Sequence, residues 1–232
     1  MEGRSRSAAM PVAERFVSIN GEGPRAGRFA AFVRFAGCNL SCSYCDTRWA
    51  CQPGCPVEQL SCAQIARWVL EQGVPCATLT GGEPLLQPLL PELARILLEQ
   101  GSCTVEVETN GACSVEPLCA LRAAHPGRLA LTLDCKLPSS GMAQHMLEGN
   151  YALLGEADCV KFVAGSEEDL VEAARVMREH GLLQRCPVYV SPVFGQIEPA
   201  DIVGFLQREG LTGARVQLQL HKLIWPGVEK GV

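Results

Sequence analysis

The sequence lacks any apolar run that approaches the roughly 18–20 residues needed to span a bilayer. Its first ten residues, MEGRSRSAAM, also lack the apolar stretch of a secretory signal. Internal repeats, low-complexity tracts and long linkers are absent as well. We therefore expect a cytoplasmic protein with no membrane partner.

Positive charge is not in excess. The chain has 20 Lys and Arg residues against 25 Asp and Glu residues, which gives a formal net charge of −5. A surface that binds nucleic acid generally needs clustered Lys and Arg. The composition therefore argues against a nucleic-acid partner.

Cysteine, by contrast, is abundant, with 13 residues. In a reducing cytosol cysteines are thiols or metal ligands, and an odd number cannot pair completely within one chain. We expect one metal site and many buried thiols. Cys76, Cys103, Cys159 and Cys186 lie beside predicted strands and are expected to behave as small buried hydrophobic residues.

The length and pattern predict one α/β domain. At 232 residues, of which 47% are hydrophobic, the chain suits a single domain over residues 12–232, with residues 1–11 as a flexible tail. Short β-rich runs alternate with amphipathic helical stretches, which indicates parallel strands with helical crossovers. About six such units fit, fewer than the eight of a closed barrel, so we predict an incomplete parallel (β/α) barrel. The predicted strands are Ala30–Phe35, Ala77–Thr80, Thr104–Glu108, Leu129–Asp134, Cys159–Val163, Val188–Ser191 and Val216–Leu220.

Two predicted helices carry N-terminal capping signals. Ser61 precedes the amphipathic run CAQIARWVLEQG. Ser166 and Asp169 have the spacing of a capping box, with Asp in place of the usual Glu or Gln. We expect a helix to begin after each serine.

Polar motifs follow four of the predicted strands. A cysteine run, GGEP, TNG and CK come directly after the strands that end near residues 35, 80, 108 and 134. In parallel α/β folds the carboxyl ends of the strands meet at one edge, where binding and catalytic residues gather. The four motifs should therefore converge on one site.

Three cysteines in the run FAGCNLSCSYCDTRWA have the spacing C-x3-C-x2-C. Thiolates this close can bind one soft metal centre. One reading is a structural zinc ion with a fourth ligand from Cys51, Cys55 or Cys62. The other is an iron–sulfur cluster held by Cys38, Cys42 and Cys45, with one iron open to a small molecule. Cys51 and Cys55 could also hold a second metal.

The GGEP motif suits a close approach of backbone to a ligand. Gly81 and Gly82 lack a Cβ, and Pro84 fixes the following turn. Glu83 offers an acceptor for an ammonium group. The plain alternative is a glycine turn capped by a glutamate.

Two acidic segments end at the same predicted edge. Glu106 and Glu108 lie on one face of their strand because side chains alternate, and buried acids are costly unless they are hydrogen-bonded. Glu108 is nearer the strand end. Asp134 and Lys136 form a similar strand-end pair, for which the alternative is a solvated strand terminus.

These motifs resemble the radical S-adenosylmethionine (SAM) superfamily, through C-x3-C-x2-C with an aromatic residue before the third cysteine and GGEP about 36 residues later. Nearly the whole chain resembles the 7-carboxy-7-deazaguanine synthase family of the queuosine and deazapurine pathway. The segments that carry this resemblance are FVSINGEGPRAGRFAAFVRFAGCNLSCSYCDT, TLTGGEPLL, VEVETNG, LDCKLPSSGM, SPVFGQIEP and LQLHKLIW.

The resemblance implies a radical SAM lyase that converts 6-carboxy-5,6,7,8-tetrahydropterin to 7-carboxy-7-deazaguanine with loss of ammonia. A reduced [4Fe-4S] cluster would cleave SAM, and the 5′-deoxyadenosyl radical would remove hydrogen from the pterin before the ring contracts. The cofactors implied are the cluster, SAM and Mg²⁺, and the partners are a reductant such as flavodoxin and a second copy of the chain in a homodimer. Two alternatives stay open: a glycyl-radical-enzyme activase and a non-catalytic zinc-binding module.

Family roles carry over to matching positions. The cluster ligands would be Cys38, Cys42 and Cys45. The SAM-binding residues would be Tyr44, Cys45, Asp46, Gly82, Glu83, Glu108, Asp134, Cys135, Lys136, Ser191, Pro192, Val193 and Phe194. The substrate-binding residues would be Ile19, Asn20, Gly21, Arg34, Thr80 and Pro226, with His221 aligned less closely. Some family members have Ser-Pro-Lys and Gln-Pro-Met-Asp where this chain has DCK and SPVF.

Thr47 has a separate implied role. In the family, the threonine of the CDT motif binds a Mg²⁺ ion that also contacts the substrate carboxylate. Mg²⁺ takes few protein oxygens and relies on waters and ligand oxygens, so a single hydroxyl is chemically reasonable. The alternative is that Thr47 only caps the chain after the cysteine loop.

Overall fold

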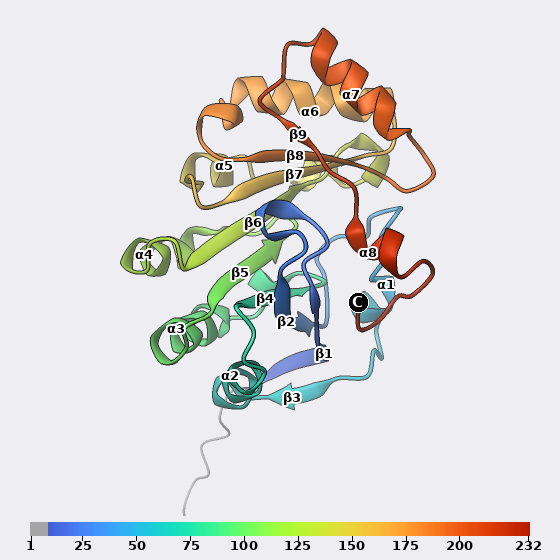
Figure 1. Ribbon diagram of the computed structural model, residues 1–232. Coiled ribbons are helices and arrows are strands. Elements are labelled where there is room, and N and C mark those ends of the chain that lie inside the picture. The colour runs from blue at the N-terminus through green and yellow to red at the C-terminus, as the bar shows by residue number, and fades with distance from the viewer. Residues whose placement is uncertain (1–8) are drawn as a thin grey trace, which may run out of the picture.

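Nine strands form one curved sheet in the computed structural model, which describes residues 9–232 (Figure 1). The order is β3-β1-β2-β4-β5-β6-β7-β8-β9. β1 is antiparallel to its neighbours β2 and β3, and all pairs from β2 to β9 are parallel. The bounds are β1 Met10–Ile19, β2 Phe29–Phe35, β3 Glu58–Leu60, β4 Cys76–Gly81, β5 Thr104–Thr109, β6 Leu129–Cys135, β7 Cys159–Ala164, β8 Val188–Pro192 and β9 Arg215–Val216.

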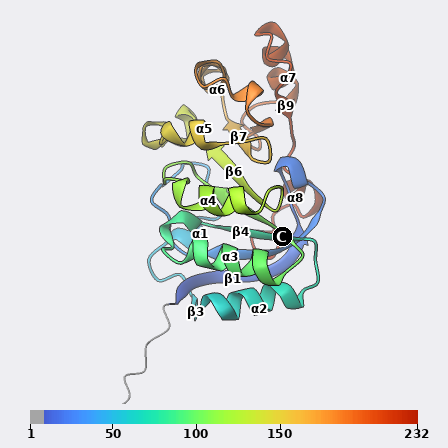
Figure 2. The ribbon, with the colours of Figure 1, turned by 90° about the vertical axis from the view of Figure 1, so that its left-hand side faces the viewer.

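Six helices connect the parallel strands and cover the outer side of the sheet. Figure 2, which looks onto this side, shows α2, α3, α4 and α5 in front of the strands. The six are α2 Cys62–Glu71, α3 Leu90–Gln100, α4 Glu116–Ala124, α5 Gly149–Leu153, α6 Glu167–Glu179 and α7 Pro199–Arg208. Short α1 (Arg48–Cys51) and α8 (Leu220–Ile224) lie on the inner side (Figure 1). β3 and β9 stand at opposite ends of the strand order, so the sheet stays open. The predicted incomplete barrel of six βα units is confirmed.

The core lies between the sheet and these helices. Leu79, Val107 and Leu131, each on a different parallel strand, have no exposed surface. Parallel strands covered by crossover helices are apolar in this way. The four thiols predicted to be buried (Cys76, Cys103, Cys159 and Cys186) are buried.

Both serine caps are present, and one differs from the prediction. Ser61 forms a full capping box, in which its Oγ accepts from the Gln64 backbone (3.3 Å) and Gln64 Oε1 accepts from the Ser61 backbone (2.9 Å). Ser166 accepts from the Asp169 backbone (3.2 Å), but the Asp169 carboxylate accepts from Ser139 (2.8 Å) and Gly165 (2.6 Å) instead. Asp169 therefore ties α6 to the loop after β6, which a capping box would not do.

The N-terminal strand is the main correction to the predicted fold. β1 begins at Met10, so the end of the predicted tail, Met10 and Pro11, belongs to the sheet, and residues 1–8 lie outside the described range. The strand was missed because it depends on its partners: Phe16 stacks on Phe32 with ring centroids 4.8 Å apart. The last predicted strand is also shorter, since β9 ends at Val216 and the chain turns helical at Leu220.

No helix within residues 9–232 is long and apolar enough to cross a membrane.

Candidate active site

A cavity of about 700 Å³ opens at the carboxyl ends of the parallel strands. The cysteine loop after β2, the ends of the next strands and the C-terminal segment form its walls. The predicted convergence of the four motifs is thus confirmed. The predicted site residues that line the cavity are Ile19, Gly21, Arg34, Cys38, Cys42, Tyr44, Cys45, Asp46, Thr47, Thr80, Gly82, Glu108, Asp134, Lys136, Val193, Phe194, His221 and Pro226.

Five predicted site residues lie behind the cavity wall. They are Asn20, Glu83, Cys135, Ser191 and Pro192, all buried and none lining the cavity. Asn20 Oδ1 accepts from the Thr78 hydroxyl at 2.9 Å, and the Cys135 thiol is 3.0 Å from the Tyr151 hydroxyl. Their side chains support the site from behind.

The cysteine loop is held by contacts to its main chain and to one aromatic ring. Arg48 Nη2 donates to the carbonyl oxygens of Cys42 (3.0 Å) and Ser43 (3.1 Å). The Tyr44 hydroxyl donates to Val163 O at 3.2 Å, which joins the cysteine loop to β7. These contacts hold the main chain of the loop in place, so its thiols are positioned by bonds that do not involve the sulfur atoms.

The three thiols are spread across the loop. Among residues 9–232, Sγ of Cys38, Cys42 and Cys45 do not all lie within 4.8 Å of one another. One tetrahedral zinc ion, with Zn–S bonds of about 2.3 Å, would hold its sulfur ligands about 3.8 Å apart. A cluster in which each thiolate binds a different iron needs wider spacing. The thiol arrangement therefore fits an iron–sulfur cluster better than one zinc ion.

Only one of the three proposed extra cysteine ligands reaches this site. Cys51 lines the cavity, its thiol donates to Thr47 O at 3.7 Å, and its closeness to Cys38 and Cys45 lowers the pKa of both thiols. Cys55 donates to its neighbouring carbonyl, and Cys62 donates to a carbonyl oxygen ahead of α3 (3.7 Å). Cys51 therefore lies beside the thiolates, while Cys55 and Cys62 point elsewhere.

The GGEP loop is packed directly against the cysteine loop. A Cβ at Gly82 would lie 2.1 Å from Gly37 O, so only glycine fits there. The Glu83 carboxylate accepts from the Thr109 hydroxyl (2.9 Å) and the Asn110 backbone (2.7 Å). Burial raises the pKa of Glu83 to about 7, although these hydrogen bonds oppose the shift. Glu83 thus joins two loops inside the protein, a position unlike the predicted ammonium-binding one.

Charged pairs occupy the floor of the cavity. Lys136 Nζ lies 2.8 Å from Asp134 Oδ2, which is the predicted strand-end pair. Lys161 Nζ lies 2.8 Å from Glu22 Oε2. Burial lowers the pKa of both lysines, but the facing carboxylates outweigh it and raise the pKa overall. Both lysines therefore stay cationic beneath a bound ligand.

The two glutamates on β5 have different surroundings: one faces the cavity and the other is buried in the protein. Glu108 lines the cavity, as predicted. Glu106 is buried, accepts from the Thr132 hydroxyl at 2.5 Å and lies 3.7 Å from Arg25. Burial raises the pKa of Glu106. The predicted need for bonding of a buried acid is met at Oε1 by Thr132, whereas Oε2 has only the ion pair with Arg25 and no hydrogen-bond partner in the described residues.

Arg34 and Thr47 face the cavity with groups available to a ligand. Arg34 Nε donates to Glu14 (2.7 Å), and its terminal nitrogens have no hydrogen-bond partner within residues 9–232. The Thr47 hydroxyl lies 3.8 Å from Cys45 Sγ. Thr47 stands at the N-cap of α1 but its side chain makes no capping bond there, in contrast to the capping alternative.

The C-terminal segment closes one side of the cavity. Asp46 Oδ2 lies 3.0 Å from Lys222 Nζ and 3.9 Å from His221 Nε2. Burial raises the pKa of Asp46, but the charge of Lys222 outweighs it and the pKa is lowered. A Cβ at Gly21 would lie 2.4 Å from His221 Nδ1, so the glycine makes room for the histidine.

The cavity-lining polar residues that sequence reasoning missed include Glu22, Asn110, Lys161 and Gln219. The signal for Lys161 was present, since a lysine in the apolar strand CVKFVA needs a buried partner. Glu22 and Asn110 stand in the quoted motifs NGEG and TNG but were given no role. Nothing in the sequence distinguished Gln219.

Comparison with known proteins identifies the class first. The model of the radical SAM superfamily matches residues 32–199, well over half of the chain. The solved structure of QueE from Escherichia coli has a TM-score of 0.71 at 21% identity, covering 92% of this chain and 95% of that one. The solved structure of native anSMEcpe with bound AdoMet has a TM-score of 0.54 at 15% identity, covering 84% of this chain and 65% of that one. Both likenesses concern the fold, which is that of a radical SAM enzyme.

Curated relatives then narrow the family. The 7-carboxy-7-deazaguanine synthase of Clostridium acetobutylicum is 42% identical over 95% of this chain and 98% of its own length. The 7-carboxy-7-deazaguanine synthase of Chlorobaculum tepidum is 38% identical over 98% and 100%. The chain belongs to the 7-carboxy-7-deazaguanine synthase family. The alternatives of a glycyl-radical-enzyme activase and a zinc-binding module are thereby set aside.

Proposed function

We propose that this radical SAM enzyme converts 6-carboxy-5,6,7,8-tetrahydropterin to 7-carboxy-7-deazaguanine with loss of ammonia. The observation that carries the proposal is a single cavity lined by the three thiols, by Arg34 with its unpartnered terminal nitrogens and by Thr47. The thiols suit an iron–sulfur cluster, and Arg34 and Thr47 suit a substrate that bears a carboxylate. Relatives of the chain named for this product support the choice.

Cys38, Cys42 and Cys45 would hold a [4Fe-4S] cluster and leave one iron for SAM. Bound SAM and the reduced cluster supply a 5′-deoxyadenosyl radical that can remove hydrogen from C6 of the pterin. The protein's task is to orient the ligands and exclude water. Tyr44, fixed through its hydroxyl, and the glycine backbone at Gly82 would border SAM.

The opposite wall would hold the pterin. Arg34 would pair its terminal nitrogens with the substrate carboxylate, since Nε is already bonded to Glu14 and fixes the plane of the guanidinium. The Thr47 hydroxyl would bind a Mg²⁺ ion together with a carboxylate oxygen and waters. The Lys161–Glu22 pair on the floor would give the polar edge of the ring one fixed donor and one fixed acceptor.

An assay of the reconstituted protein tests the proposal. Protein loaded anaerobically with iron and sulfide is incubated with SAM, Mg²⁺, a one-electron reductant and the carboxypterin, and products are identified by mass. We expect 7-carboxy-7-deazaguanine with SAM not consumed in proportion. Arg34→Lys should lower kcat/KM at least tenfold, whereas Arg95→Lys, an exposed arginine on α3, should not change it.

Formation of 5′-deoxyadenosine without deazaguanine would contradict the proposed substrate while leaving the radical SAM class intact. We further propose that an external reductant such as flavodoxin supplies the electron and that the chain acts as a homodimer in the cytoplasm. Reduction of the cluster by flavodoxin and the mass of the protein in solution would test the first two statements.

A further inference from the structure

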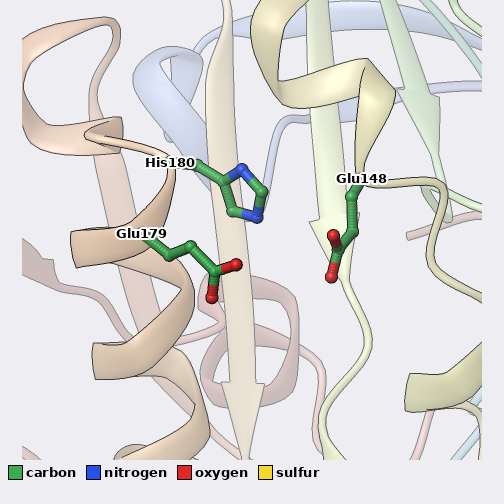
Figure 3. Close-up of side chains that lie close together, drawn as sticks. All are labelled: Glu148, Glu179 and His180. Carbon is green, nitrogen blue, oxygen red and sulfur yellow. The ribbon is translucent and has the colours of Figure 1, made fainter.

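A group of side chains of metal-ligating types lies away from the cavity. Glu148 precedes α5, Glu179 is the last residue of α6, and His180 follows it as the C-cap (Figure 3). None of the three lines the active-site cavity. The group brings two consecutive βα units together on the outer side of the sheet.

The three side chains are arranged around one point. His180 Nε2 or Nδ1 and one carboxylate oxygen from each glutamate all lie within 4.8 Å of one another, and this is the only such group of His, Cys, Asp and Glu in residues 9–232. Figure 3 shows a nitrogen of the His180 ring directed toward the gap between the two carboxylates. His180 Nε2 is shielded from solvent and finds no hydrogen-bond partner in the described part of the chain. Buried polar atoms usually have a hydrogen-bond partner, so this nitrogen is open to a ligand held between the two acids.

The histidine is held in this position by its surroundings. Its backbone N–H donates to Val176 O at 3.1 Å, and its carbonyl accepts from Arg185 Nε at 3.1 Å. Its ring packs on Tyr151 with centroids 4.5 Å apart, and the Tyr151 hydroxyl is in turn 3.0 Å from Cys135 Sγ. The imidazole therefore has little freedom to turn away from the carboxylates.

The charge of the group favours a divalent cation. Glu179 already bonds to Arg175, but through Oε2 only, and the other nitrogens of Arg175 bind Glu172. The exposed side chain of Glu148 has no hydrogen-bond partner among the residues that the structure describes. One imidazole nitrogen and two carboxylate oxygens are ligands that zinc accepts, with water in the fourth position.

We propose that Glu148, Glu179 and His180 form a zinc site that is separate from the active site. Zinc bound there joins the end of α6 to the segment that leads into α5. That segment includes Met146, whose sulfur accepts from the Lys136 backbone at 3.2 Å. The site thus braces, from the outside, the segment that supports Lys136 in the cavity floor.

Zinc titration of the cluster-loaded protein tests this site. In that form Cys38, Cys42 and Cys45 are occupied by iron, so they do not compete for zinc. After treatment with a chelator, one zinc ion per chain should bind and survive desalting. X-ray absorption at the zinc edge should show only nitrogen and oxygen ligands near 2.0–2.1 Å, with no sulfur near 2.3 Å.

Two site variants and two control variants test whether these side chains bind the zinc ion. His180→Gln and Glu148→Gln should each weaken zinc binding at least tenfold with unchanged iron content, while His125→Gln and Glu156→Gln, outside the group, should not. Glu148→Gln is the safer variant because its side chain is exposed and unbonded in the described structure. Sulfur ligation, zinc binding by both site variants as tight as that of the parent protein, or failure of the parent protein to retain zinc would overturn the proposal.

Discussion

At the scale of single residues, a motif does not say whether a side chain faces a ligand or supports the site from behind. Glu83 and Gly82 are neighbours in GGEP, yet the glycine lines the cavity and the glutamate is buried between two loops. The sequence correctly identified the residue types and their convergence. It could not predict the direction of Glu83, because this depends on donors from Thr109 and Asn110 on another strand.

The thiols give the simplest residue-scale prediction. Cys42→Ala should lower the iron content of reconstituted protein from about four per chain to below one, because two thiolates cannot hold a cluster of this kind. Cys186→Ala removes a buried thiol beside β8 and should leave the iron content unchanged. Iron assay and visible absorption measure both. Full iron in Cys42→Ala would show that this residue is not a ligand.

Thr47 should matter to Mg²⁺ and not to the cluster. Thr47→Ala is expected to keep its iron, since the loop is fixed by Arg48 and the carbonyl groups of Cys42 and Ser43. It should lose the stimulation of turnover by Mg²⁺. A normal response of the variant to Mg²⁺ would refute the assignment of the hydroxyl to this ion. Thr47→Ser, which keeps the hydroxyl, serves as the matched control.

The raised pKa of Glu83 should make the free energy of unfolding depend on pH. Its pKa in the folded protein is raised to about 7 from 4.5, so the folded state binds more protons than the unfolded state between these values. The free energy of unfolding should therefore fall as pH rises from about 5 to 8, by roughly 3 kcal/mol at about 1.4 kcal/mol per pKa unit. Denaturant titrations of cluster-free protein under anaerobic conditions measure it.

The matched variants isolate this contribution. Gln at position 83 cannot ionise. Between pH 5 and pH 8 the free energy of unfolding of Glu83→Gln should therefore fall much less than that of the parent protein. Glu168→Gln changes an exposed glutamate on α6 and should keep the parental slope. Equal slopes in the parent and Glu83→Gln would mean that Glu83 is not the source of the dependence.

At the scale of helices and strands, the elements that could be predicted are those with local signals. The parallel strands are apolar runs between turn residues, and all six full-length ones were placed within two residues of their ends. β1 carries Pro11, Glu14 and Arg15, and it forms because β2 and β3 pair with it. The helix start at Ser61 has a local signal and was predicted, whereas the reciprocal capping box predicted for Ser166 and Asp169 is found at Ser61 and Gln64 instead.

This cap can be measured directly. Ser61→Ala should lower the free energy of unfolding by about 1 kcal/mol, because the Gln64 backbone N–H loses its acceptor at the start of α2. Denaturant titration gives the value. Gln64→Ala and the double variant complete the cycle, and the two effects should be less than additive because the side chains act together. Fully additive losses would argue against a reciprocal cap.

At the scale of the whole molecule, the C-terminal segment packs against β1 and α1 beside the cavity. Lys230 Nζ lies 4.2 Å from the centre of the Trp49 ring, and the Gly231 backbone donates to Glu14 at 3.3 Å. Glu14 in turn fixes Arg34. Contacts so far apart in sequence could not be predicted without the fold, which explains why this wall of the site was the least well anticipated.

Removal of residues 228–232 should weaken substrate binding without loss of the cluster. The Lys230–Trp49 contact contributes about 0.5–1 kcal/mol, so KM for the carboxypterin should rise about two- to fivefold. Iron content should stay the same because the cysteine loop keeps its own contacts. Steady-state kinetics at saturating SAM provide the measurement. An unchanged KM would show that this segment does not close on the substrate, and Lys230→Ala tests the single contact.

The position of the C-terminal segment also has a consequence for biosynthesis. Chains are made from the N-terminus, so the cysteine loop is synthesised long before the segment from Gln219 to Val232 that forms part of the cavity wall. Until that segment emerges from the ribosome, Cys38 and its two partners face an open groove. Iron and sulfide carriers therefore have their widest access to the thiols before this segment is made, and its packing against the groove narrows that access.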